Sequence, residues 1–184
     1  MNTYEKNKYE YMFNLVFNPQ KIADALWIAP EDVITYLTDG RVAAKFAEIW
    51  VSNLYGLNLA TNSNEKGSDA FLPTDVPMLG NDTLSASVKT LTKSGIKFQM
   101  SKFVGSGRTC TKDDLLNSIL EAYLMAVVDI IDFPNVLVTV VKQKTLVKAV
   151  INGNLTLTGW NREKYYLHSF GRDLNDIYFK EMPV

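Results

Sequence analysis

The segment LSASVKTLT (84–92) alternates apolar and polar side chains over the length of a whole β-strand. Its apolar positions include Ala86 and Val88, whereas Ser87 and Lys89 fall on the opposite side. Successive side chains of a strand point to opposite faces of the sheet. The pattern therefore predicts a strand with one apolar and one polar face, and it places Ser87 and Lys89 on the same face.

Other segments predict the elements around this strand. Predicted helices cover 30–37, 41–56 and 115–131. Predicted strands cover 68–72, 96–104, 136–143, 145–153, 154–160 and 164–170. The helix over 41–56 ends at Gly56, and its expected apolar stripe runs through Val42, Phe46 and Trp50. The order of elements predicts an α+β (mixed α/β) fold, with a central, mostly antiparallel or mixed β-sheet flanked by helices.

The 184 residues are expected to form a single domain, in which 1–40 is a helical N-terminal segment and 41–184 the core. No apolar run reaches the roughly 18 residues that a membrane span needs. The N-terminal sequence is polar and of mixed charge, which is not typical of a signal peptide. We therefore expect a cytoplasmic protein without a membrane partner.

The single cysteine and the single histidine of the chain exclude several chemistries. Cys110 is the only cysteine, so neither an intrachain disulfide nor a multi-cysteine zinc site can form. His168 is the only histidine, which excludes histidine metal clusters. Neither residue has a partner in the sequence that would favour it as a nucleophile or general base.

The charges are unevenly distributed, although the net charge is only −1. Between residues 83 and 112 there is no acidic residue, and the basic ones are Lys89, Lys93, Lys97, Lys102, Arg108 and Lys112. A local basic strip on a nearly neutral protein favours an anionic partner that must be selected, such as a specific DNA site. The alternative is a solvated, charged face of a hairpin.

Three charged residues in this order predict a site for phosphodiester chemistry. Glu48 lies beside the apolar stripe of the predicted helix, Asp69 lies in the predicted strand 68–72, and Lys89 lies in the next strand. Carboxylates hold a hard cation such as Mg²⁺ through oxygen, and a lysine stabilises charge near the attacking water. The alternatives are a turn aspartate, a solvent-facing lysine and a solvated glutamate.

This order of residues resembles the PD-(D/E)xK nuclease superfamily, and type II restriction endonucleases in particular, over about residues 41–131. The resemblance implies that Asp69, Glu48 and the backbone carbonyl of Val88 bind Mg²⁺, and that Lys89 is the motif lysine. Ser87 stands where the family usually has an acidic residue, and some restriction enzymes of the superfamily also read Ser-x-Lys there. The implied catalytic set is Asp69, Lys89, Glu48 and Ser87.

The resemblance also implies a partner and a setting. Double-stranded DNA would be cut at specific sequences, and cutting both strands implies a homodimer or a partner subunit, in a bacterial or phage-encoded setting. The glycine-rich loop 105–108 precedes a predicted helix start at Thr111, where it could hold a phosphate or read a guanine. The expected DNA contacts are Lys93, Lys97, Gln99, Ser101, Lys102, Ser106 and Arg108.

Two alternatives remain open at this level. The chain could be a non-enzymatic DNA-binding or assembly protein, or a nuclease fold whose site has degenerated because Ser87 replaces an acid. Glu121 and Asp129, both within the predicted helix 115–131, are alternative sources of a carboxylate, or solvated residues at the rim of that helix.

Overall fold

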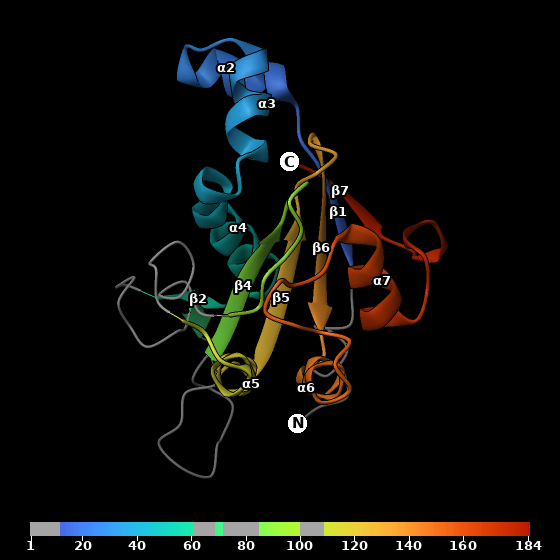
Figure 1. Cartoon of the computed structure of the whole chain (residues 1–184). Coiled ribbons are helices and arrows are strands. Elements are labelled where there is room, and N and C mark those ends of the chain that lie inside the picture. Colours follow the sequence, from blue (N-terminus) through green and yellow to red (C-terminus); the bar gives the residue numbers. More distant parts are fainter. Residues whose placement is uncertain (1–11, 61–68, 72–84, 100–108) are drawn as a thin grey trace.

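A seven-stranded mixed sheet runs through the middle of the molecule, with helices on both of its faces (Figure 1). The computed structural model describes residues 12–60, 69–71, 85–99 and 109–184. The α+β class with a central sheet flanked by helices is confirmed. No helix within these ranges is both long and apolar enough to cross a membrane.

The helices are α2 (Pro19–Leu26), α3 (Pro30–Thr38), α4 (Gly40–Tyr55), α5 (Lys112–Leu120), α6 (Gln143–Ile151) and α7 (Arg162–Phe170). The strands are β1 (Phe13–Val16), β2 (Asn58–Leu59), β3 (Ala70–Phe71), β4 (Ser85–Leu91), β5 (Leu124–Asp129), β6 (Asn135–Val141) and β7 (Lys180–Pro183). A short 3₁₀ turn spans Leu174–Asp176.

The strands lie in the order β2-β3-β4-β5-β6-β1-β7. The pairs β2–β3, β3–β4, β5–β6 and β1–β6 are antiparallel, whereas β4–β5 and β1–β7 are parallel. Because parallel neighbours need a crossover connection, α5 lies between β4 and β5 in the chain. Along the chain, α4 is followed by a small antiparallel unit of β2, β3 and β4, and then by α5 and β5.

Two separate apolar layers cover the sheet. On one face, Ala86 and Val128 pack with Ala47 and Val51 of α4. On the other, Leu91 and residues of α5, α6 and α7 form the second layer, together with the buried Trp160, Tyr165 and Tyr166. Strand β4 is thus covered on both faces, and Ser87, on its predicted polar face, is only 3% exposed.

Helix α4 is closely held against β4 at its first residue. Asp39 caps it by accepting a hydrogen bond from the backbone N–H of Arg41, and Gly56 ends it in the left-handed conformation. A Cβ on Gly40 would lie 2.7 Å from Cγ2 of Thr92 in the turn after β4. Only glycine therefore allows this approach of the helix to the strand.

The predicted apolar stripe of α4 is one position out. The buried residues are Ala43, Ala47, Val51, Ser52 and Tyr55, whereas Val42 and Phe46 are exposed. Small alanines allow the helix to approach the sheet, and the larger apolar side chains were mistaken for the buried ones. Because the buried face of α4 is shifted by one position from the predicted one, Glu48 lies at its border.

Several predicted elements are corrected. The segment 115–131 is not one helix, because α5 ends at Leu120 and the apolar run that follows forms the fully buried strand β5. An uninterrupted apolar run suits a buried parallel strand as well as a helix. The segments 145–153 and 164–170 are helical, as parts of α6 and α7. The N-terminal segment also contains β1, an inner strand of the sheet.

The described parts of the predicted strands 96–104 and 154–160 share one β-bridge, between Ile96 and Trp160, and the rings of Phe98 and Trp160 also meet edge to face. Lys97 to Gln99 are irregular, and residues 100–104 lie outside the described part of the chain. The carbonyl of Phe98 accepts a hydrogen bond from Ser118 of α5, which fixes this segment against the second apolar layer.

Candidate functional site

Asp69 is held by the strand beside it. It directly precedes β3, and its backbone N–H bonds the carbonyl of Ala86 in β4 at 2.9 Å. Its side-chain Oδ2 accepts the backbone N–H of Val88 at 2.6 Å and the hydroxyl of Ser87 at 3.2 Å. Among the described residues both donors therefore orient Asp69 through the same carboxylate oxygen.

The backbone carbonyl of Val88 points to the same side of β4 as Asp69. The N–H of Val88 and the carbonyl of Ala86 both bond Asp69. The carbonyl of Ser85 points the other way, where it accepts the N–H of Tyr123 just before β5. Because polar backbone groups alternate along a strand, the carbonyl of Val88 lies on the Asp69 side.

Glu48 reaches the same region from α4, whose Ala47 packs in the layer that covers Ala86. Its Oε2 accepts a hydrogen bond from Nζ of Lys45 at 2.5 Å. The side chain of Glu48 is 19% exposed, whereas that of Lys45 is 62% exposed. The carboxylate is therefore set inward, and the ammonium covers it from the solvent side.

Lys89 is attracted electrostatically by both carboxylates. It is half-buried, and burial lowers its pKa below the ordinary lysine value, against the attraction of Asp69 and of Glu48. The pKa of Lys45 is raised by its hydrogen bond to Glu48, and Asp69 raises it further. Lys45, Glu48, Asp69 and Lys89 therefore form one interacting set, called the charge cluster below.

The carboxylates of the charge cluster, together with the backbone carbonyl of Val88, offer the kind of ligand atoms that suit a magnesium ion. Asp69, Glu48 and the carbonyl of Val88 offer only oxygen, which Mg²⁺ prefers. In the described ranges no three His, Cys, Asp or Glu residues gather into a group that could hold a metal. Mg²⁺ commonly uses one or two carboxylates and fills its other positions with water and substrate phosphate, so two carboxylates are sufficient.

The predicted DNA contacts do not all reach this region. Lys93 and Lys97 are exposed, whereas Gln99, also an expected DNA contact, is only 8% exposed. The side-chain Oε1 of Gln99 has no hydrogen-bond partner among the described residues. Ser101, Lys102, Ser106 and Arg108 lie outside the described residues.

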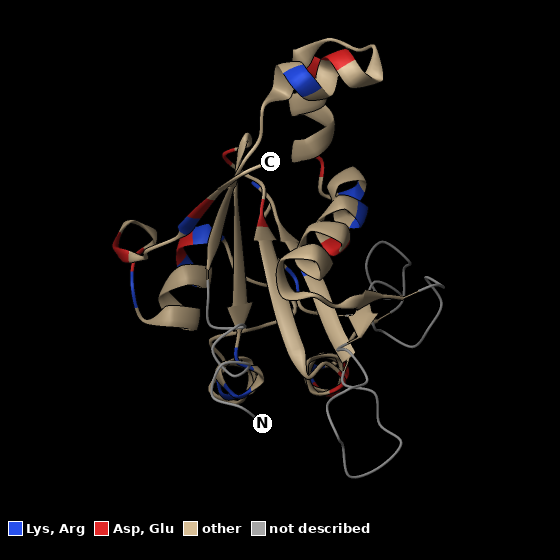
Figure 2. Cartoon of the chain, turned by 180° about the vertical axis from the view of Figure 1, so that it is seen from behind, with Lys and Arg blue, Asp and Glu red and all other residues tan. Residues whose placement is uncertain are grey.

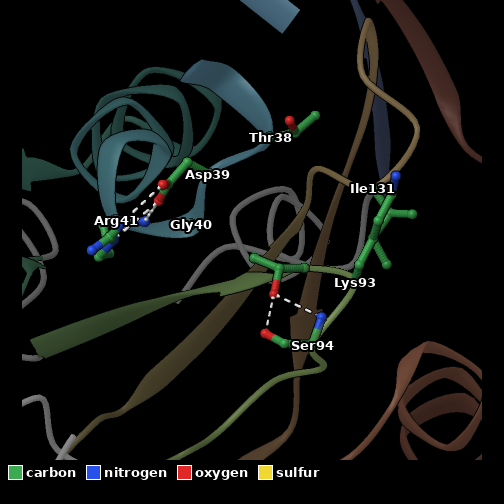
Figure 3. Close-up of a pocket in the computed structure, with 8 residues that line it drawn as sticks. Thr38, Asp39, Gly40, Arg41, Lys93, Ser94 and Ile131 are labelled. Carbon is green, nitrogen blue, oxygen red and sulfur yellow. Dashed lines mark hydrogen bonds and ion pairs between the residues drawn. The ribbon is translucent and has the colours of Figure 1, made fainter. Parts of the chain in front are cut away.

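An open pocket of about 450 Å³ lies where α4 begins and β4 ends (Figure 3). It is lined by Thr38, Asp39, Gly40, Arg41, Thr92, Lys93, Ser94 and Ile131. Arg41 pairs with Asp39 on one side, and Thr92 bonds Ser94 on the other. Two basic residues and three hydroxyl groups therefore meet in one hollow. Of these, the sequence pattern had singled out only Lys93.

The alternative carboxylates are engaged elsewhere. Asp129 is 1% exposed, not a solvated rim residue, and it accepts hydrogen bonds from Arg162 at 2.6 Å and from Tyr166 at 3.0 Å. Glu121 is exposed at the end of α5. Neither is joined to the charge cluster by any contact within the described residues, and Asp129 instead ties the end of β5 to α7.

Comparison with known proteins adds no relative. No family model matches the chain, and neither a curated protein nor a solved structure is similar to it.

Proposed function

We propose that the chain is a Mg²⁺-dependent, sequence-specific endonuclease that hydrolyses phosphodiester bonds of double-stranded DNA. The observation that carries this proposal is the carboxylate of Asp69, which is fixed by Ser87 and Val88 and attracts the charge of Lys89. Glu48 of the preceding helix α4 also attracts Lys89, and the resemblance to the PD-(D/E)xK nucleases implies that it binds the metal. The fold order of α4, two short strands, β4 and α5 accords with the same resemblance.

Each residue has a defined task in this proposal. Asp69, Glu48 and the carbonyl of Val88 would hold Mg²⁺. A bound Mg²⁺ polarises the phosphate and lowers the pKa of a water ligand. Lys89 stabilises the attacking hydroxide and the negative charge that grows on the phosphate. Its lowered pKa makes it an easier proton donor than an ordinary lysine.

Ser87 takes a different part from the acid that it replaces. Its hydroxyl donates to Oδ2 of Asp69, so it orients a ligand rather than acting as one. Glu48 then supplies the second carboxylate from α4. Outer groups of this kind affect metal affinity strongly because they fix the geometry of the ligands.

Substrate binding is assigned to the pocket beside the charge cluster. Arg41 and Lys93 line it. Arg41 belongs to α4, and Lys93 lies two residues after the end of β4; these two elements also carry residues of the cluster. Phosphate groups of the DNA backbone suit such basic and hydroxyl groups. Since one site cuts one strand, a homodimer or a partner subunit would cut both.

Cleavage of a long mixed-sequence DNA, such as a phage genome, tests the proposal. We expect discrete fragments with Mg²⁺, none with EDTA, and none with Lys89→Ala. Lys148→Ala is the control, because Lys148 is exposed on α6 and has no contact with the cluster in the described residues. Intact DNA under every condition, with purified and folded protein, would contradict an active nuclease made of this chain alone.

A non-enzymatic interaction protein is the second candidate, and a different observation favours it. Helices α2 and α3 project from the body of the molecule (Figure 1), and Leu26 and Trp27, at the end of α2, are 62% and 96% exposed. Exposed large apolar groups are typical of an interaction surface. Retained DNA binding or assembly with no cleavage by wild type would favour this candidate.

A further inference from the structure

The pair of Lys45 and Glu48 lies at the edge of the proposed metal site. Nζ of Lys45 is 2.5 Å from Oε2 of Glu48, three residues further along α4. Figure 2 shows basic and acidic residues side by side on this helix. Glu48 is the inward partner and Lys45 the exposed one. The ammonium therefore occupies the solvent side of a carboxylate oxygen that the proposed function assigns to Mg²⁺.

Two positive charges cannot share one carboxylate without repulsion. A divalent cation at Glu48 would lie within a few ångströms of the ammonium of Lys45, where like charges repel. Lys45 is on a long, flexible and mostly exposed side chain, so it can leave Glu48 at little cost. An ordinary surface pair would have no such consequence, because neither of its members would also bind a metal.

We infer that Lys45 and the divalent cation compete for Glu48, and that the displaced Lys45 then binds a phosphate of the DNA backbone. This inference rests on the proposed function and adds a residue that the sequence pattern did not single out. When the ammonium of Lys45 leaves the carboxylate of Glu48 for a phosphate, one charge-assisted hydrogen bond replaces another. Metal binding would thereby strengthen the hold on the substrate.

Titration of the DNA-free protein with Mg²⁺ tests the competition. We expect Lys45→Met to bind Mg²⁺ about tenfold more tightly than wild type, because one repelling charge is removed. Lys45→Arg should keep wild-type affinity, since it keeps the charge. Lys148→Met, an exposed lysine on α6, is the control and should change nothing. A purely structural pair would change only the melting temperature.

Salt dependence of DNA binding tests the second half. With Ca²⁺, which shares the preference for oxygen ligands, the logarithmic salt slope of wild type should exceed that of Lys45→Met by about 0.9. In EDTA the two slopes should be equal, because Lys45 remains on Glu48. A difference of equal size in both conditions would contradict the release of Lys45.

The outcomes separate the two proposals. Wild-type Mg²⁺ affinity in Lys45→Met, or weaker affinity, overturns the competition while leaving the nuclease proposal standing. No Mg²⁺ binding by wild type or by Lys45→Met overturns the metal-dependent function, and the competition with it.

Discussion

The hydroxyl of Ser87 donates to Oδ2 of Asp69 at 3.2 Å, across two neighbouring strands. The backbone N–H of Val88 bonds the same oxygen at 2.6 Å. A serine in the place of an acid therefore keeps a defined task, which is to fix the direction of the carboxylate. The proposed metal site depends on this direction, since it determines where the other oxygen of Asp69 points.

Ser87→Ala removes this hydrogen bond without changing the charge of the site. We expect Mg²⁺ affinity to fall about tenfold, in the range typical of groups that orient metal ligands. Titration of the purified variant with Mg²⁺ measures it. Ser85→Ala is the matched control, because Ser85 lies on the same strand but donates to the carbonyl of Glu121. Equal affinities of wild type and Ser87→Ala would show that Asp69 needs no such support.

Lys89→Met should make the protein more stable at neutral pH while abolishing cleavage. Burial lowers the pKa of Lys89, so the unfolded chain binds its proton more readily than the folded one. Wild-type stability therefore rises with pH from the lowered pKa up to the ordinary lysine value of about 10.4, and the advantage of the variant shrinks over that window. Melting temperatures from neutral to alkaline pH measure this.

The exposed Lys93 provides the control for that experiment. Lys93→Met should show no such advantage at neutral pH, because the side chain of Lys93 is exposed. A Lys89→Met variant that melts below wild type at pH 7 would contradict the claim that the buried charge of Lys89 destabilises the fold. Such a cost in stability is common for residues of active sites.

Gly40→Ala should destabilise the protein by about 1–3 kcal/mol, the usual range for overpacking. The new Cβ would meet Cγ2 of Thr92 at 2.7 Å and push α4 away from β4. Helix propensity alone predicts the opposite sign, since alanine is the better helix former. Thr92→Ser removes the clashing methyl, so the double variant should recover most of the loss in urea unfolding.

Arg41→Ala and Lys93→Ala should each weaken binding of double-stranded DNA. Removing one cation from a DNA phosphate should lower the logarithmic salt slope by about 0.9, uniformly over different sequences. Fluorescence anisotropy of a labelled duplex over a range of salt concentrations measures this. Lys144→Ala, on α6, is the control. Unchanged salt slopes in both pocket variants would contradict the proposal that the pocket binds DNA.

Local patterns were sufficient where one element could be read by itself. The bounds of α4, the strand β4 and the helix start at Thr111 follow from the sequence. The same holds for the shared face of Ser87 and Lys89, because alternation in a strand is strict. These elements carry Glu48, Ser87, Val88 and Lys89 of the proposed site.

Tertiary context decided the rest. The apolar segment after Leu120 fits a helix and a buried strand equally well, and only its place between β4 and β6 selects the strand. The contact of Lys45 with Glu48 was missed because an i,i+3 pair looks the same on any exposed helix face. The burial of Asp129 depends on Arg162, which is 33 residues away in sequence.

A crystal of the protein soaked in Mn²⁺ tests most directly that Glu48, Asp69 and Val88 form a cation site. Mn²⁺ shares the oxygen ligands of Mg²⁺ and can be located by anomalous diffraction. The account predicts an anomalous peak about 2.2 Å from carboxylate oxygens of both Asp69 and Glu48, and its loss in Asp69→Asn. A peak bound elsewhere, or none at this position at saturating Mn²⁺, would contradict the account.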